Sequence, residues 1–253
     1  MSATGPIQPS FGAPQFPPAF RSFAVVDGQE PMAAAVAAVA GGEGGAGDLF
    51  WSTDTDQAAA AFVLEPEVPL SRAIQMAPVL MVAIGDALGA IGPPALAITF
   101  RWPLTVLANG GAVGGVFVAV PDGVVPSQVP GTLIVGFNLA VESAAGDGEP
   151  GHHPDSTALH EEGCGDLDRT VLVEAVARHF LAWIDSWLQD GFSTVRQSWM
   201  SRAYDLERPV KLALAGGNRA GTMIGLDEDG SLLLEAGRSI DAVPLVDAVE
   251  PCR

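Results

Sequence analysis

The spacing of apolar residues changes at Pro209, and this change limits the folds that are open to the chain. Before Pro209, segments with helical spacing alternate with apolar strand-like runs, a mixture that is typical of an α+β domain. After it, only short strand-like runs remain, separated by turns such as Gly216-Gly217-Asn218 and Asp227–Gly230. We therefore predict a proline-rich arm over residues 1–20, an α+β domain over 21–206 and a small β-barrel over 207–253.

The longest apolar segment is typical of a helix that is buried inside a protein. Apolar residues recur at helical spacing from about Leu70 to Ile91, and Gly92-Pro93-Pro94 ends the run. Within it stand Gln75, Pro78 and Asp86, which a membrane-spanning helix seldom tolerates. We therefore expect a core helix here and no membrane span.

A second long helix is predicted over Arg169–Asp190, where one face is apolar and the other polar. Asp168 is a suitable N-cap, and Gly191 is a suitable end. His179 lies on the apolar side, where a hydrogen-bonded core histidine is the more frequent role. A shorter helix is expected over Thr194–Tyr204.

Apolar runs bounded by turn residues predict the strands of the larger domain. The polar turn with Asp54 and Asp56 separates two of them, and Asn109-Gly110-Gly111 separates two others. A short alanine-rich helix is expected over Met32–Val39, and an irregular acidic loop over Ser143–Gly165. The predicted strands are Ser22–Val26, Leu49–Ser52, Ala59–Leu64, Ala95–Trp102, Val113–Val120 and Thr132–Glu142.

The chain is strongly acidic, with 30 aspartate and glutamate residues, 12 lysine and arginine residues and a formal net charge of −18. Such a surface repels nucleic acids and anionic membranes, so we expect neither as a partner. Two cysteines, Cys164 and Cys252, are too few for a disulfide framework and favour reduced thiols in the cytoplasm. The N-terminal residues lack a basic region followed by an apolar run, so no secretory signal is predicted.

Four short stretches in a fixed order resemble motifs of the biotin/lipoate protein ligase family. They are Gly42–Ser52 with its spaced glycines, Phe100–Thr105 with Trp102-Pro103, Ala112–Phe117 with Gly114-Gly115, and Ile134–Leu139 with Gly136 and Asn138. The tail, residues 210–246, is similar to the SH3-like C-terminal domain of biotin protein ligases. The resemblance implies a class II synthetase-like domain, in which helices pack on a mixed or antiparallel sheet, followed by an SH3-like barrel. It also implies ATP-dependent transfer of biotin, lipoate or a related acid to a carrier protein.

The charged groups of that family are missing from this chain. The resemblance places arginines of the glycine loop at Glu43, Gly45, Ala46 and Asp48, an asparagine and an acidic residue at Leu104 and Thr105, and the essential lysine at Ala112. Between Ser22 and Asp168 there are eighteen acidic side chains and two basic ones, Arg72 and Arg101. Acyl-adenylate formation builds negative charge on phosphate oxygens that cations must stabilise, so ordinary ligation is not expected.

By resemblance, the ligand-binding candidates are glycines, two tryptophans, an arginine and an asparagine; the catalytic residues remain unknown. For three features the sequence leaves an alternative open. The glycine loop is either a ligand-binding loop or a flexible connector, Trp102 is either a pocket wall or core, and Arg101 either binds an anion or forms a salt bridge. The candidates are Gly42, Gly44, Gly47, Trp51, Arg101, Trp102, Gly114, Gly115 and Asn138.

Metal-ligating residue types gather in the acidic loop, but their spacing matches no tight site, and no metal is expected. They are His152, His153, Asp155, His160, Glu161, Glu162 and Cys164.

Three functions remain open at this point. The leading hypothesis is a diverged ligase-like protein that binds a small acyl ligand or a biotinyl or lipoyl carrier domain. The alternative is an active ligase with a rearranged site that uses Arg101, Arg72 or a cation. The third is a purely structural partner whose pocket is filled by side chains. Biotin, lipoate and ATP are possible ligands by resemblance only, and a homodimer is an open possibility.

Overall fold

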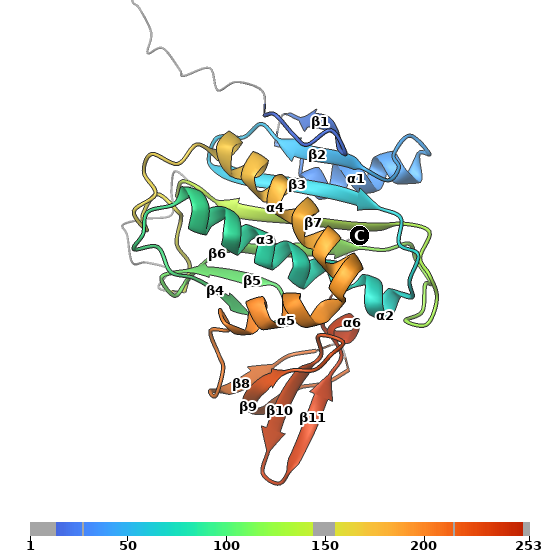
Figure 1. Cartoon of the computed structure of the whole chain (residues 1–253), viewed down its shortest axis with the longest axis vertical. Coiled ribbons are helices and arrows are strands. Elements are labelled where there is room, and N and C mark those ends of the chain that lie inside the picture. Colours follow the sequence, from blue (N-terminus) through green and yellow to red (C-terminus); the bar gives the residue numbers. More distant parts are fainter. Residues whose placement is uncertain (1–13, 27, 144–154, 215, 250–253) are drawn as a thin grey trace, which may run out of the picture.

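The computed structural model describes residues 14–26, 28–143, 155–214 and 216–249. Within them, seven strands form one sheet, in the order β1-β2-β3-β7-β6-β5-β4, and four form another (Figure 1). In the larger sheet β1 is parallel to β2 and the other neighbours are antiparallel, so the sheet is mixed and the predicted α+β class is confirmed. The strands of this sheet are β1 (Arg21–Val25), β2 (Asp48–Ser52), β3 (Gln57–Leu64), β4 (Ile98–Arg101), β5 (Thr105–Ala108), β6 (Gly111–Ala119) and β7 (Leu133–Ala140).

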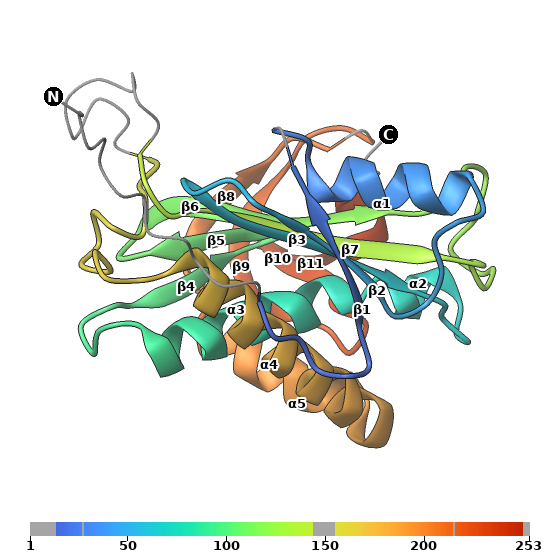
Figure 2. The ribbon, with the colours of Figure 1, turned by 90° about the horizontal axis from the view of Figure 1, so that it is seen from above.

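Helices cover both faces of the larger sheet. Helix α1 (Pro31–Ala40) lies on one face, and helices α3 (Met76–Ile91) and α4 (Arg169–Asp190) lie on the other (Figure 2). A small core that includes Met32 and Phe50 fills the α1 side, whereas a larger core fills the α3–α4 side. Gly136 in β7 lets α1 approach closely, because a Cβ there would stand 2.5 Å from the Met32 Sδ.

The predicted core helix is divided in two. Helix α2 (Leu70–Ala73) is followed by α3, and the two residues between them form an irregular turn. Pro78 explains the break, because it has no N–H to donate to the carbonyl of Ile74; that carbonyl accepts from the Ala77 N–H instead. The 22-residue segment is long and apolar enough to cross a membrane, but 78% of its most apolar window is buried, as expected of a core helix.

Helix α4 begins and ends where the sequence predicts. The Asp168 side chain caps it by accepting from the Thr170 N–H at 2.7 Å, and Gly191 follows its last residue with a positive φ of 72°. Helix α5 (Phe192–Met200) comes directly after Gly191, slightly earlier than predicted.

The region that was expected to hold three strands after α3 holds four. The prediction treated Ala95–Trp102 as one strand and resumed at Val113. The structure instead ends β4 at Arg101, turns through residues 102–104 and forms the short β5, which pairs with β4 and β6. The Asn109-Gly110 turn lies between β5 and β6, and both residues have positive φ.

The C-terminal strands form a second, antiparallel sheet in the order β11-β10-β9-β8. The predicted barrel is not closed in the described residues, where β8 and β11 are the two edges of an open sheet (Figure 1). Four strands are too few to curl round and pair at both edges. They are β8 (Pro209–Leu212), β9 (Arg219–Leu226), β10 (Leu232–Ala236) and β11 (Ser239–Val243), followed by α6 (Leu245–Ala248).

Candidate functional site

A pocket of about 490 Å³ opens on the larger sheet, where β6 begins and β7 ends. It lies on the α1 face, because Gly136 faces α1 and Asn138, two residues further along β7, points to the same side. None of the described residues that line it has an ionisable side chain. They are Pro103, Leu104, Thr105, Val113, Gly114, Gly115, Val116, Phe117, Asn138 and Ala140.

Two glycines form the floor of this pocket. Gly114 has a φ of 145°, and a Cβ there would stand 2.0 Å from the carbonyl oxygen of Asn138. A Cβ on Gly115 would stand 2.6 Å from the carbonyl oxygen of Leu104. The neighbouring backbones therefore require glycine at both positions, and the same absence of side chains leaves the floor open.

Asn138 is a polar lining residue whose side chain takes part in a chain of hydrogen bonds. Its Nδ2 donates to Gln57 Oε1 at 2.7 Å, and Gln57 Nε2 donates to Asp54 Oδ2 at 2.9 Å. Gln57 and Asp54 were not predicted as site residues. The only signal for them in the sequence was the polar turn that contains Asp54.

Three of the positions that depart from the family pattern lie in or next to this pocket. Leu104 and Thr105, which stand in place of an asparagine and an acidic residue, both line it. Ala112, in place of the lysine, directly precedes lining residue Val113. The Ala112 backbone is held on both sides, since its N–H donates to Asp155 and its carbonyl accepts from Thr157.

The glycine loop lies elsewhere. It follows the C-terminal end of α1, whereas Met32 at the N-terminal end stands over Gly136 beside the pocket. A ten-residue helix spans about 15 Å, so the length of α1 separates the loop from the pocket. Gly42, Gly44 and Gly47 are therefore not brought to the pocket.

The backbone donors of the glycine loop are already used within the chain. From Gly41 to Asp48, each N–H donates to an oxygen of this protein: backbone carbonyls accept from six of them, and Asp48 and Glu65 accept from Gly45 and Ala46. A loop that bonds all its own donors offers none to an anion. In this structure the loop is a connector, as in the second role left open by the sequence, but it is ordered by its own hydrogen bonds and not flexible.

Asp48 carries a negative charge at a position where the family resemblance implied an arginine. It is 2% exposed, and its carboxylate accepts from Arg21 Nε and Nη2, both at 2.8 Å. The hydrogen bond from Arg21 is the main cause that holds the pKa of Asp48 below its ordinary value; burial opposes it, and the Gly45 N–H reinforces it.

Three other candidates lie outside the pocket. Trp51 packs on the core of the α3–α4 side and against the ring of Phe16 in the N-terminal arm. Trp102 is 5% exposed, and its Nε1 donates to the carbonyl of Gly230 in the smaller sheet at 3.4 Å, which fits the core role.

Arg101 has partners in the chain segment that joins the two sheets. Its Nε stands 3.2 Å from Asp205 Oδ2, and its guanidinium lies 5.0 Å from the centre of the Tyr204 ring. This is the salt bridge that the sequence left open as the alternative to anion binding. Arg72, the other basic residue of the region, lies 5.8 Å from the Trp187 ring.

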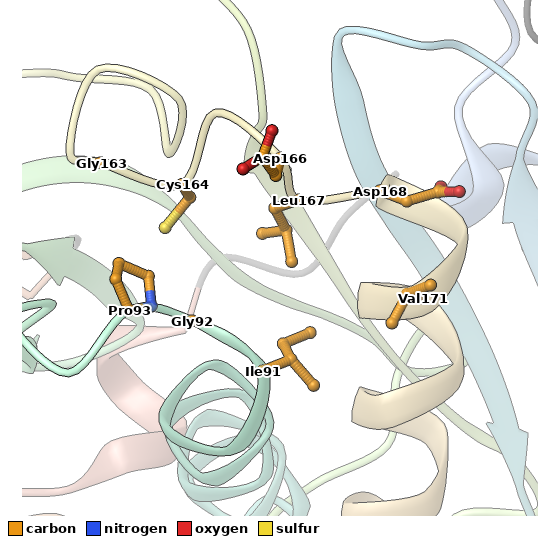
Figure 3. A pocket seen from close by; sticks show the side chains of 9 residues that line it. All are labelled: Ile91, Gly92, Pro93, Gly163, Cys164, Asp166, Leu167, Asp168 and Val171. Atoms are coloured by element: carbon orange, nitrogen blue, oxygen red, sulfur yellow. The ribbon is translucent and has the colours of Figure 1, made fainter.

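A second pocket, of about 360 Å³, lies on the opposite side, between the end of α3, the loop at residues 163–168 and the start of α4. Its centre is apolar, and the Cys164 thiol points toward Pro93, while the carboxylates of Asp166 and Asp168 point away (Figure 3). Burial raises the pKa of Cys164, and the charge of Glu162 adds to the effect. The thiol is therefore a poor nucleophile at neutral pH.

The acidic loop was considered for metal ligands. His152 and His153 lie outside the described residues, so their part of that cluster is not placed. Within the described residues, no three histidine, cysteine or acidic side chains gather closely enough to hold a metal. His160 Nδ1 lies 3.6 Å from Glu142 Oε1.

Ligases are among the known proteins with similar sequences. Residues 16–201 match the sequence pattern of the Biotin/lipoate A/B protein ligase family. The Biotin--[acetyl-CoA-carboxylase] ligase of Paracoccus denitrificans is 31% identical over 192 residues, which cover 75% of this chain and 79% of that protein. The bifunctional ligase/repressor BirA of Bacillus subtilis is 21% identical, and the match covers 74% of this chain but 56% of that longer protein.

Solved structures of similar proteins have the same fold. A biotin protein ligase-like protein of unknown function from Silicibacter sp. TM1040 has a TM-score of 0.84 and 34% identity, over 94% of this chain and 100% of that one. The biotin protein ligase of Aquifex aeolicus in complex with biotin and ATP has a TM-score of 0.69 and 20% identity, over 88% and 95%, and supports the fold alone. The resemblance found in the sequence is thus confirmed, and the chain belongs to the biotin/lipoate A/B protein ligase family.

Proposed function

We propose that this protein is a diverged family member that binds a small acyl ligand, free or attached to a carrier domain, and does not make an acyl-adenylate. The observation that carries the proposal is the pocket on the sheet, whose described lining has no ionisable side chain. On this proposal the protein works in the cytoplasm, in keeping with the free thiol of Cys164.

The walls of the pocket suit an acyl chain or ring. Leu104, Val116 and Phe117 are apolar lining residues, and Phe117 is 42% exposed. Burial of each methylene group of a ligand against such walls is worth about 0.8 kcal/mol. A purely structural partner would instead be expected to fill this space with its own side chains, so the open volume favours a binder.

The charges of the structure argue against ATP chemistry. A nucleoside triphosphate needs cations or free N–H groups around its phosphates, and losing one such donor costs on the order of a hundredfold in rate. Three basic groups of the α+β domain, including the two that lie between Ser22 and Asp168, are engaged elsewhere: Arg21 with Asp48, Arg101 with Asp205, and Arg72 over Trp187. The donors of the glycine loop are also used internally.

The same charges favour a neutral acyl group over a free acid. With no cation in the described lining, nothing offsets the cost of moving a carboxylate from water toward the pocket. An acyl group that is attached to a carrier through an amide has lost that charge. We therefore expect the methyl esters of biotin and lipoate to bind at least as tightly as the acids.

Isothermal titration with biotin, lipoate, octanoate, the two methyl esters and ATP tests the proposal. Saturable heat is expected from at least one acyl ligand and none from ATP. Ala140 lines the pocket, so Ala140→Leu should fill it and weaken acyl binding at least tenfold. Ala220→Leu, on an exposed strand position of the smaller sheet, is the matched control and should change nothing. The absence of binding by every acyl ligand would refute the proposal.

A second candidate is an active biotin or lipoyl protein ligase with a rearranged site. It is favoured by the 31% identity to a protein named Biotin--[acetyl-CoA-carboxylase] ligase. In that case a divalent cation would have to supply the missing positive charge. Pyrophosphate release in the presence of Mg-ATP, mixed acids and a carrier domain distinguishes the two: robust, acid-dependent release supports the ligase and removes the first proposal.

A further inference from the structure

The pocket on the α3–α4 side of the larger sheet has no part in the proposed function. Its volume of about 360 Å³ lies within the range of small-molecule sites, and it has room for a ring with a short side arm. The end of α3 forms one wall, the loop at residues 163–168 forms a second, and the first turn of α4 forms a third (Figure 3). The pocket is therefore a separate candidate for a ligand site.

Hydrogen bonds within the loop hold its wall in place without help from a ligand. The Cys164 N–H donates to the Leu159 carbonyl at 3.0 Å, and the Leu167 N–H donates to the Cys164 carbonyl at 2.9 Å. The Nε2 of His160 lies 3.3 Å from the Leu167 carbonyl oxygen and ties the start of the loop to its end. Because this wall is already ordered, binding costs little further loss of conformational entropy.

The centre of the pocket is apolar. Ile91, Pro93 and Leu167 line it, and the Cys164 thiol points toward Pro93 (Figure 3). Val171, in the first turn of α4, adds an apolar side chain that is 42% exposed. No other large apolar side chain that is exposed in the described residues belongs to the lining, so the apolar area is small for a protein partner. The space suits the ring or alkyl part of a small molecule.

The charged side chains of the lining are both acidic. Asp166 and Asp168 turn their carboxylates outward from the apolar centre, so negative charge gathers at the mouth (Figure 3). The Asp168 carboxylate accepts from the Thr170 N–H, whereas no described residue donates to the Asp166 carboxylate. Burial is the main cause that raises the pKa of Cys164, and the charge of Glu162 adds to it, so a third carboxylate acts on the same space.

We propose that this pocket binds a small apolar ammonium ion, a ring or short alkyl group that carries one amine. The apolar part lies against Ile91, Leu167 and Val171, and the ammonium group stands at the mouth beside Asp166. An anion of the same shape is repelled there, since none of the described lining residues carries a positive charge. The two pockets lie on opposite faces of the larger sheet, so this ligand and an acyl ligand do not compete for space.

Three probes of similar shape and different charge test the proposal. Phenethylamine is a cation at neutral pH, phenethyl alcohol is neutral, and phenylacetate is an anion. The amine should bind about fivefold more tightly than the alcohol, the upper end for an exposed ion pair, and the anion should bind more weakly than either. In about 1 M NaCl the ratio of amine to alcohol affinity should fall toward one, because salt screens exposed charges.

Amide chemical shifts of the isotope-labelled full chain give both the affinities and the place of binding. Titration with the amine should shift the signals of Gly92, Gly163 and Leu167, which line the pocket. Shifts at Gly114 and Gly115 in their place would put the probe in the sheet pocket and would overturn the proposal.

Two pairs of variants test the two halves of the site. Asp166→Asn should lower the ratio of amine to alcohol affinity to about two or less and leave the alcohol affinity unchanged, whereas Asp122→Asn, at an exposed turn, should keep the ratio. Val171→Trp should cover the pocket and weaken all three probes at least fivefold. Leu188→Trp, on the same helix and 69% exposed, should change nothing. Thermal unfolding shows that each variant is folded.

The remaining outcomes also decide the proposal. An amine that binds the unaltered protein no more tightly than the alcohol, or an amine-to-alcohol ratio that Asp166→Asn leaves unchanged, would overturn it. The absence of binding by all three probes would do the same. None of these results bears on the titrations with acyl ligands, so the failure of this proposal and the failure of the proposed function are distinguishable.

Discussion

At the scale of single residues, Asp48 is a buried side chain with several polar partners at the end of the glycine loop. Its two oxygens accept from Arg21 and from the Gly45 N–H, and the carboxylate is almost wholly enclosed. Such a group stabilises the fold when it is charged, because the donors around it are lined up for an anion. These contacts lie within the chain and involve no ligand, so the role of Asp48 is to order the loop.

Asp48→Asn should therefore reduce the free energy of unfolding by about 1–3 kcal/mol at pH 7, since a charged acceptor is replaced by a neutral one. Urea denaturation measures it. Asp122→Asn, at an exposed turn, is the matched control and should stay within about 0.5 kcal/mol of the unaltered protein. An equal effect of the two substitutions would show that the buried carboxylate adds nothing.

The effect of Asp48→Asn should also depend on pH. The pKa of Asp48 is lower in the folded chain than in the unfolded one, so the folded protein binds fewer protons at this group. Its stabilisation is complete above the unfolded-state pKa of about 4 and is lost as the pH falls through the lower folded value. The difference between the two proteins in urea should shrink below pH 4; a constant difference from pH 7 to pH 2 would contradict it.

The sequence predicted single residues well only where their partners are near in the chain. Asp168 as an N-cap was predictable, because it bonds Thr170 two residues later. The partner of Arg101 is 104 residues away and that of Asn138 is 81 residues away. For that reason the sequence suggested a salt bridge for Arg101 as an alternative but could not identify its partner. It did not indicate Gln57 as a site residue at all.

At the scale of elements, the periodicity of apolar residues predicted the long helices correctly. Short strands and turns without a clear pattern were predicted less well. Helix α4 has a clear apolar face over 22 residues, so its bounds were found. Strand β5 has four residues and follows a tight turn at 102–104, too short a run for alternation to be visible. The open form of the smaller sheet was missed because pairing at sheet edges is a tertiary property that local spacing does not determine.

The contact between α1 and β7 depends on Gly136. A Cβ there would press on Met32 Sδ at 2.5 Å and on the carbonyl oxygen of Ala60 at 2.8 Å. Gly136→Ala is expected to lower the free energy of unfolding by about 1–3 kcal/mol through overpacking. Gly131→Ala has nothing within 4 Å and serves as the control.

The double variant Gly136→Ala with Met32→Ala separates the two contacts. Removing the Met32 side chain should relieve part of the clash, so the two substitutions together should cost at least 0.5 kcal/mol less than their sum, on the order expected for residues in contact. Thermal and urea unfolding measure the cycle. Strict additivity would mean that α1 moves away from the sheet as a unit and does not depend on this approach.

At the scale of the whole molecule, the two sheets share one core. The larger core cluster includes Trp102 and Phe192 of the α+β part together with Leu226 and Leu232 of the smaller sheet. Trp102 Nε1 also donates to the Gly230 carbonyl between β9 and β10. The division at residue 206 is therefore one of sheet topology, and the two parts are expected to unfold together.

Trp102→Ala should accordingly destabilise the whole chain by about 3–5 kcal/mol, because it leaves a cavity where the two sheets meet. Hydrogen exchange of amides in β6–β7 and in β9–β10 measures the protection of each sheet, and both should fall together. Leu188→Ala, 69% exposed, is the control. Protection lost in one sheet alone would indicate two independent folding units.

The internally bonded glycine loop has a consequence for how fast ligands exchange. Where a mobile segment closes over a bound molecule, escape must wait for that segment to open. Here the loop is already ordered, and it stands at the far end of α1 from the open groove on the sheet. As far as the described residues are concerned, this loop does not slow dissociation, so occupancy should track the ambient concentration of the ligand with little lag.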